Sequence, residues 1–177
     1  MTREQLAKRI ADVALLRGDF TLRSGRKSSY YLDKYRFETQ PDVLAELGKL
    51  FAEKAIAAGA DRIAGPELGA VALAAVASTA SGKPFVIIRN QKKDYGSSKL
   101  IEGMINTGES VFIVEDILTT GSQVLEAAKV LEAAGCKVAG ICGVINRQEG
   151  AEANIINAGY KFDALFTTED LGITPGQ

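Results

Sequence analysis

Apolar positions along the chain follow two spacings, one typical of helices and one typical of buried strands. Leu6, Ile10 and Val13 recur at helical spacing and predict an amphipathic helix over residues 3–17. Short runs rich in Val, Ile and Phe instead predict strands, at residues 20–22, 29–32, 62–65, 84–88, 110–114, 138–145 and 162–166. Further helical patterns cover residues 41–58, 70–80, 123–134 and 150–157.

This alternation of strands and helices predicts an α/β fold with a central, mostly parallel sheet and helices on both faces. The 177 residues suit a single domain. Ligands of such sheets bind beyond the carboxyl ends of the strands. The segments expected at that edge are residues 66–69, 89–99, 115–122 and 146–149.

Composition removes several classes of function. Lys and Arg total 21 against 22 Asp and Glu, so no net charge attracts nucleic acid or a membrane surface. The N-terminus shows no apolar signal region and no run approaches 18 apolar residues, so we expect a cytoplasmic enzyme or regulator. The chain has no histidine, which excludes Ser-His and Cys-His mechanisms and most zinc sites. We expect Cys136 and Cys142 to be unpaired core thiols.

The most informative segment is Val114–Ser122, where an apolar run meets two acids and then Thr-Thr-Gly-Ser before a helix. Backbone N–H groups and hydroxyls of Thr119–Ser122 would converge on a phosphate at the helix N-terminus. Glu115 and Asp116 instead suit sugar hydroxyls, Mg²⁺ or a developing cation. Together they describe a site for a phosphorylated ribose. The plainer alternative is that an acid only caps the next helix.

Other phosphate-binding motifs are absent from the sequence. It has no Gly-x-x-x-x-Gly-Lys-Ser/Thr and no Gly-x-Gly-x-x-Gly between a strand and a helix. Residues 89–99 carry four cations, one anion and no aliphatic side chain. We expect this basic segment to be a mobile lid that places Lys or Arg against a leaving pyrophosphate, and alone it would read as a solvated hairpin.

Four segments together resemble one known family. Val114–Ser122 resembles the phosphoribosyl pyrophosphate signature of the type I phosphoribosyltransferases, and Phe20–Tyr31 resembles the N-terminal motif of their orotate-specific members. Lys99–Gly103 is similar to the end of the family's lid, and Asn146–Glu149 to its orotate-contacting segment. The resemblance implies one phosphoribosyltransferase domain over residues 1–177, with a small N-terminal hood at 1–35 and a flexible lid at 89–99.

The resemblance also implies roles for individual residues. Glu115 and Asp116 would hold the ribose hydroxyls and, with Lys93, act as the catalytic groups. The residues implied in binding phosphoribosyl pyrophosphate are Arg23, Arg89, Lys93, Tyr95, Glu115, Asp116, Ile117, Leu118, Thr119, Thr120, Gly121, Ser122 and Gln123. Those implied for orotate are Tyr30, Tyr31, Thr119 and Arg147, the last as partner of the orotate carboxylate.

The implied reaction joins orotate to the ribose and releases pyrophosphate through an oxocarbenium-like state, as in glycoside cleavage, with Mg²⁺ as cofactor and no protein metal ligands. A homodimer with shared active sites is implied in the same way. The chain departs from the family at Tyr95, where histidine is usual, and at Asn90, where lysine is common. Gly69 stands where one branch carries lysine and another a small residue, and Arg23 replaces the usual lysine with its charge preserved.

Two alternative functions stay open at the level of sequence. One is a phosphoribosyltransferase for another nucleobase, and the other is a non-catalytic regulator that senses phosphoribosyl pyrophosphate and binds nucleic acid. Arg147 distinguishes orotate from the other nucleobases of the first alternative, because only an acidic base requires a guanidinium at that position. Balanced charge opposes the second. Arg147 could also simply pair with Glu149.

Overall fold

A central sheet carries the fold in the computed structural model, which describes residues 1–21, 25, 27–90 and 100–173. Within these ranges the sheet has six strands in the order β5-β4-β3-β6-β7-β8. All neighbours are parallel except β5, which pairs antiparallel with β4 at one edge. The strands are β3 (Arg62–Pro66), β4 (Phe85–Ile88), β5 (Ile101–Glu102), β6 (Ser110–Leu118), β7 (Lys137–Asn146) and β8 (Phe162–Thr167).

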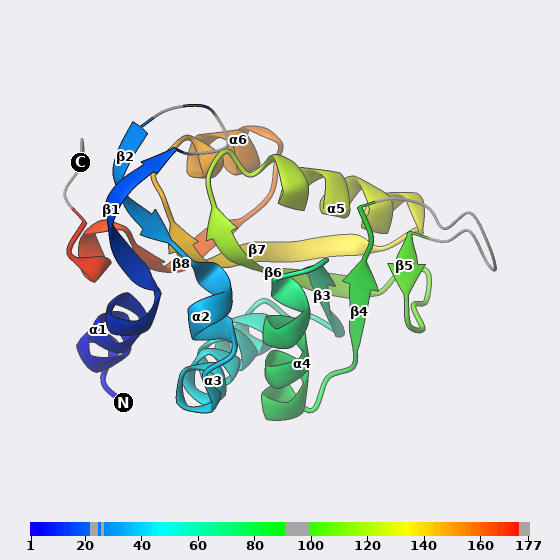
Figure 1. Ribbon diagram of the computed structural model, residues 1–177. Helices are drawn as coiled ribbons and strands as arrows, with labels where there is room; N and C mark the ends of the chain where they lie inside the picture. The colour runs from blue at the N-terminus through cyan, green and yellow to red at the C-terminus, as the bar shows by residue number, and fades with distance from the viewer. Residues whose placement is uncertain (22–24, 26, 91–99, 174–177) are drawn as a thin grey trace.

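Helices cover both faces of this sheet (Figure 1). On one face, Leu47 and Phe51 of α3 pack in one core cluster with Leu73 of α4 and Val114 of β6. On the other face, Leu131 of α5 lies in a second cluster. The first layer holds α1 (Arg3–Ala14), α2 (Lys34–Glu38), α3 (Pro41–Ala57) and α4 (Ala70–Ser81), and the second holds α5 (Ser122–Ala133) and α6 (Ala151–Asn157). The predicted α/β architecture is confirmed.

A separate hairpin stands beside the sheet near its carboxyl edge. It consists of β1 (Leu15–Thr21) and β2 (Lys27–Leu32), which pair antiparallel from Leu15 opposite Leu32 to Thr21 opposite Lys27 (Figure 1). This hairpin forms most of the segment expected as an N-terminal hood. Most of its turn, at residues 22–24 and 26, lies outside the described residues.

Several details differ from the predicted elements; for example, β1 begins at Leu15 instead of residue 20, and β5 was not predicted. The first helix ends at Ala14 instead of residue 17, because Leu15–Arg17 pair with β2 and this pairing overrides helix propensity. Helix α2 was not predicted, since five residues are too few to show a helical period. Strand β6 runs on to Leu118 and does not end at 114, so both acids lie within it. Cys136 and Cys142 are buried and unpaired, as predicted.

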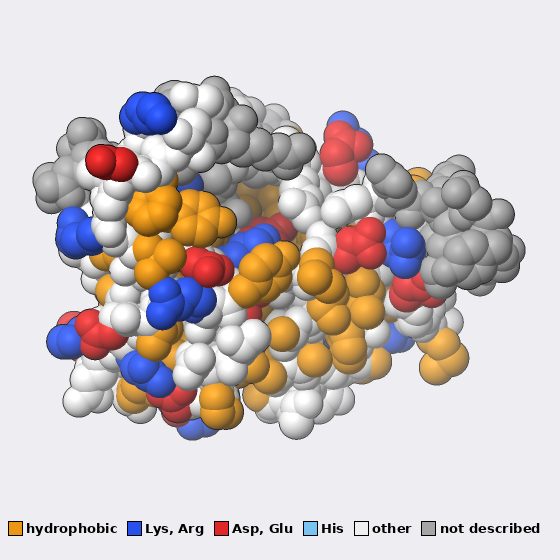
Figure 2. Space-filling view, viewed as in Figure 1, with side chains coloured by type: hydrophobic (Ala, Val, Ile, Leu, Met, Phe, Trp, Pro, Cys, Tyr) orange, Lys and Arg blue, Asp and Glu red, His pale blue; other side chains and the backbone are white. Residues whose placement is uncertain are grey.

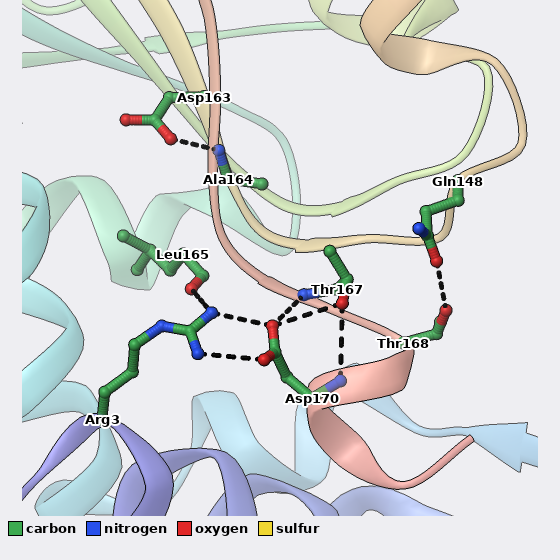
Figure 3. A network of polar contacts seen from close by, with 8 residues as sticks. All are labelled: Arg3, Gln148, Asp163, Ala164, Leu165, Thr167, Thr168 and Asp170. Carbon is green, nitrogen blue, oxygen red and sulfur yellow. Dashed lines mark hydrogen bonds and ion pairs between the residues drawn. The ribbon is translucent and has the colours of Figure 1, made fainter. Parts of the chain in front are cut away.

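The N-terminal helix is joined to the C-terminal end of the chain by an ion pair (Figure 3). The guanidinium of Arg3 donates to both carboxylate oxygens of Asp170, at 2.9 and 2.7 Å, and to the carbonyl of Leu165 at 3.0 Å. Asp170 belongs to a short 3₁₀ helix, Glu169–Leu171, and also accepts from the Thr167 N–H at 2.8 Å. The hydrogen bond from Arg3 lowers the pKa of Asp170 to about 2.

No helix in the described ranges is long and apolar enough to cross a bilayer.

The Arg3–Asp170 pair makes a testable contribution to stability. A double-mutant cycle of Arg3→Met and Asp170→Asn should give a coupling of about 1 kcal/mol at pH 7, because the pair is partly exposed. Asp170 has a lowered pKa in the folded state, so this stability is complete above its unfolded pKa and is lost as the pH falls. Urea denaturation at pH 7 and pH 3 should show the coupling reduced by about half. A coupling that does not change with pH would contradict the assignment.

Candidate active site

The loops that follow the parallel strands meet at one edge of the sheet. The side-chain amide of Gln123, in α5, donates to the Glu67 carbonyl after β3 at 2.9 Å. Asn90, after β4, donates its N–H to the Glu67 carboxylate at 2.9 Å and its amide to the Glu67 carbonyl at 3.2 Å. The Arg147 N–H, after β7, donates to the Leu118 carbonyl at 2.9 Å. The described parts of the four loops expected to form the site therefore lie together, and residues 91–99 are outside the described residues.

The loop Thr119–Ser122 joins β6 to α5 in a form suited to an anion. Gly121 has φ 76°, a left-handed conformation that favours glycine, and a Cβ there would come within 3.2 Å of Ile155. The carbonyls of Thr119 and Thr120 accept from the Ala151 N–H at 3.0 Å and from the Asn154 amide at 2.9 Å. No side chain caps the N-terminus of α5 and its first turn has no acid, so its N–H groups suit a phosphate.

Glu115 and Asp116 are buried beside this loop, 4% and 3% exposed. One carboxylate oxygen of Glu115 accepts from the Asp116 N–H at 3.0 Å, and the other has no hydrogen-bond partner among the described residues. Burial, followed by the charge of Asp116, raises the pKa of Glu115 well above its ordinary value. A buried oxygen without a partner is costly, so Glu115 is prepared to accept a ligand hydroxyl.

Two side chains of α2 reach the acidic pair, and neither was anticipated from the sequence. Lys34 forms an ion pair with Asp116, with 2.6 Å between Nζ and Oδ2. Burial opposes the ammonium charge, but the hydrogen bond and charge of Asp116 outweigh it, so the pKa of Lys34 is raised. Glu38 is 4% exposed, and burial together with the charge of Asp116 raises its pKa to about 8. The only sequence signal was the i, i+4 spacing of Lys34 and Glu38.

Gly69 leaves the space in which this ion pair lies. A Cβ on Gly69 would be 1.7 Å from Oδ2 of Asp116 and 3.0 Å from Nζ of Lys34. Real Cβ atoms do not approach oxygen so closely, so any larger residue would displace the Asp116 carboxylate. The departure at Gly69 is therefore matched to the Lys34–Asp116 pair.

Arg147 and Tyr30 lie together on the other side of the loop. The Arg147 guanidinium donates to the Tyr30 hydroxyl at 3.3 Å and lies over its ring, 5.8 Å from the centroid. It also pairs with Glu149 at 3.1 Å, so the alternative partner weighed for Arg147 is present as well. Nε of Arg147 is buried without a hydrogen-bond partner among the described residues. An acidic planar ligand could satisfy it.

The segment around Arg147 is fixed by its neighbours. Gln148 has φ 59°, an uncommon conformation for a residue with a side chain, and its N–H donates to the Asn146 side chain at 2.9 Å. Its side-chain oxygen accepts from the Thr168 hydroxyl at 3.3 Å (Figure 3). The Arg147 guanidinium therefore extends from a turn whose conformation is fixed by these hydrogen bonds.

The remaining predicted residues have different placements. Tyr31 is 46% exposed on the opposite face of β2 from Tyr30, where it packs against Phe20 with ring centroids 5.7 Å apart. Arg89 lies near the carboxylates of Glu67 and Glu102, at 3.8 and 3.9 Å. Ile117 donates its N–H to Asp116, and Leu118 is buried. Three predicted site residues, Arg23, Lys93 and Tyr95, lie outside the described residues, as do residues 91–99 of the expected lid 89–99.

The face drawn in Figure 2 shows acidic and basic side chains next to each other within a hollow near the centre of the molecule. Apolar side chains border the hollow on both sides. Polar groups at the bottom of an apolar-lined depression are the usual composition of a small-molecule site.

The raised pKa of Glu38 predicts a pH-dependent cost to stability. The unfolded chain releases this proton near pH 4.5, whereas the folded chain retains it to about pH 8, so stability is lost as pH rises between these values. Glu38→Gln cannot ionise and should raise the free energy of unfolding by about 1–2 kcal/mol at pH 8, with a smaller gain at pH 5. Urea titrations at both pH values, with the exposed Glu53→Gln as control, would check this. An equal gain at both pH values would contradict it.

Comparison with known proteins agrees with this geometry. Residues 36–165 match the family model "Phosphoribosyl transferase domain". Orotate phosphoribosyltransferase of Methanocella arvoryzae is 48% identical over 87% of this chain and 87% of its own, and that of Pyrococcus abyssi is 43% identical over 96% and 94%. Among solved structures, Mycobacterium tuberculosis orotate phosphoribosyltransferase in complex with Fe(III) dicitrate superposes with a TM-score of 0.88, 31% identity and coverage of 97% and 99%. The same protein in complex with 5-phospho-α-D-ribosyl 1-diphosphate gives a TM-score of 0.83. This chain belongs to the orotate phosphoribosyltransferase family.

Proposed function

We infer that this protein is an orotate phosphoribosyltransferase, which transfers the 5-phosphoribosyl group of phosphoribosyl pyrophosphate to orotate in pyrimidine biosynthesis. The products are orotidine 5′-monophosphate and pyrophosphate. One observation carries the inference within the structure: the Arg147 backbone is hydrogen-bonded to Leu118, directly before the phosphate loop. A guanidinium for an acidic base and an N-terminus for a sugar phosphate are thus built side by side.

The donor would be bound by groups of opposite character. The uncapped N-terminus of α5, with the hydroxyls of Thr119, Thr120 and Ser122, would take the 5′-phosphate. Glu115 and Asp116 would accept hydrogen bonds from the ribose hydroxyls, which uses the unpartnered oxygen of Glu115. Arg89, with Lys93 from the lid segment, would contact the pyrophosphate.

The acceptor would lie between the phosphate loop and the hairpin. The orotate carboxylate would pair with Arg147, replacing its contacts with Glu149 and Tyr30. Tyr30 would then border the base, as would Thr119, whereas Tyr31 lies on the opposite face of β2 from Tyr30. Its assignment to the base pocket remains a prediction.

The reaction forms a bond between a ring nitrogen of orotate and the ribose anomeric carbon as the bond to pyrophosphate breaks. The ring nitrogen loses its proton as the new bond forms, and an oxygen of the leaving pyrophosphate, which gains negative charge, would accept that proton. A histidine base is then not required, which suits a chain without histidine. Positive charge develops on the sugar in an oxocarbenium-like transition state. The Asp116 carboxylate, fixed beside the ribose, would stabilise that charge, and cations of the lid would stabilise the leaving pyrophosphate.

Mg²⁺ is proposed as the cofactor. The described residues hold no cluster of three or more acidic or thiol side chains that could bind a metal ion without a ligand. Mg²⁺ favours phosphate and hydroxyl oxygens, so we expect it to be bound by the pyrophosphate and ribose oxygens of the donor. Bound there, it would neutralise the leaving group.

We also propose a homodimer that works in the cytoplasm. Both are carried over from the resemblance of the sequence to the family. In the dimer that the resemblance implies, the lid and Arg23 would contribute to the active site of the partner subunit.

The direct test is the absorbance of orotate mixed with protein, phosphoribosyl pyrophosphate and Mg²⁺, with uracil and hypoxanthine as parallel acceptors. We expect loss of orotate absorbance that requires both the donor and Mg²⁺. Turnover with another base alone would keep the family chemistry and overturn the role of Arg147. Donor binding without any turnover would favour the regulator.

Arg147→Ala should lower kcat/KM for orotate at least hundredfold, because a charge-assisted, partly buried pair is removed; tenfold corresponds to about 1.4 kcal/mol. Steady-state assays should show little change in the affinity for phosphoribosyl pyrophosphate. Arg9→Ala, which breaks an exposed ion pair with Asp42, is the matched control and should leave the kinetics unchanged. A loss of less than tenfold for Arg147→Ala would contradict pairing with the orotate carboxylate.

A further inference from the structure

Lys34 is a charged side chain of the site to which neither the sequence pattern nor the proposed function assigns a role. It comes from the first turn of α2, directly after the hairpin, and its ammonium lies 2.6 Å from Oδ2 of Asp116. The Lys34 side chain is 32% exposed, whereas that of Asp116 is 4% exposed. The pair therefore joins the buried acids to the open side of the site.

The contact fixes one half of the Asp116 carboxylate. Oδ1 of Asp116 accepts from the adjacent Ile117 N–H, and Oδ2 accepts from Lys34. Lys34 also lies over the ring of Tyr35, 5.3 Å from its centroid, so the ammonium is held from two sides. With one oxygen bound by the backbone and the other by Lys34, the carboxylate plane has a defined orientation.

Lys34 also compensates negative charge in the most buried part of the site. Three carboxyl groups, those of Glu38, Glu115 and Asp116, are each less than 5% exposed. The charge of Lys34 acts against the raised pKa values of Glu38 and Glu115. Without it, Asp116 would be a buried charge with no cation in contact among the described residues, and the cost of its desolvation would not be compensated.

The ion pair of Lys34 and Asp116 occupies space that only a glycine at position 69 leaves free. Gly69, at the N-terminal end of α4, has no side chain, and a Cβ there would collide with Oδ2 of Asp116 and meet Nζ of Lys34. A surface ion pair would impose no such restriction on a third residue. Among the described residues, the pairs of Lys8 with Asp12, Lys49 with Glu46 and Lys129 with Glu126 lie on exposed helix faces.

We propose that Lys34 is a positioning residue for phosphoribosyl transfer, holding the Asp116 carboxylate where it meets the ribose hydroxyls of the donor. This rests on the proposed function. Lys34 acts through Asp116 and not by its own contact with the diphosphate, so its effect must depend on the presence of the Asp116 carboxylate.

The test is a double-mutant cycle of Lys34→Met and Asp116→Asn, read by calorimetric binding of phosphoribosyl pyrophosphate in MgCl₂ without orotate. Lys34→Met should weaken donor binding about tenfold in the wild-type background and less than threefold when Asp116→Asn is present. In assays with orotate, Lys34→Met should raise KM for the donor and lower kcat, with KM for orotate within twofold of wild type. Lys34→Arg, which keeps a cation on Asp116, should recover most of the loss.

Lys54→Met is the matched control, because Lys54 is 33% exposed and paired with Asp163 away from the site. It should leave donor binding unchanged. An equal effect of Lys34→Met in both backgrounds would overturn positioning in favour of direct or long-range action on the donor. Unchanged donor binding in Lys34→Met would overturn the proposal altogether. If the wild-type protein binds the donor but does not consume orotate, the proposed function fails while the binding cycle still decides on Lys34.

Discussion

Two carboxylates buried side by side, Glu115 and Asp116, impose the constraint around which the site is arranged. Their burial in the central strand β6 places negative charge where water cannot solvate it. The structure offsets this cost by raising the pKa of Glu115, by the Lys34 ion pair with Asp116, and by backbone N–H donors to both acids. Gly69 follows from the same constraint, since only a residue without a side chain leaves room for the pair.

The same edge of the sheet must also attract anions, and it does so with separate groups. The α5 N-terminus lies one loop beyond the acids. The carbonyls of this loop accept hydrogen bonds from α6, and no side chain caps the first N–H groups of α5. Arg147 lies beyond it, on the turn after β7. In the proposed function, phosphate, ribose and acidic base would therefore have distinct partners along β6 and β7, and this separation would limit repulsion between the acids and the phosphates.

Hydrogen bonds to one short loop keep these parts in register. The Glu67 carbonyl accepts from Gln123 and from Asn90, so the ends of β3 and β4 and the start of α5 are linked through one carbonyl group. Asn90 thus has a structural role at a position where the family often carries lysine. At the opposite side, Arg3 binds Asp170, Asp170 binds Thr167, and the adjacent Thr168 donates to Gln148, which connects the N-terminal helix to the turn that carries Arg147 (Figure 3).

The sequence by itself determined the sheet with helices on both faces and the loops that meet at its carboxyl edge. Buried strands and helices of ordinary length leave clear periodicities in the sequence, and the motif from Val114 to Ser122 is contiguous. The fold and this motif can therefore be predicted from the sequence alone. The tertiary structure decided that Leu15–Arg17 form a strand, because the pairing with β2 is non-local. It also decided the roles of Lys34, Glu38 and Gly69, because these residues meet Asp116 only in the folded chain. Lys34 is 82 residues from Asp116 in the sequence. The five residues of α2 are too few to show a helical period, so the sequence does not predict the helix that carries Lys34 and Glu38.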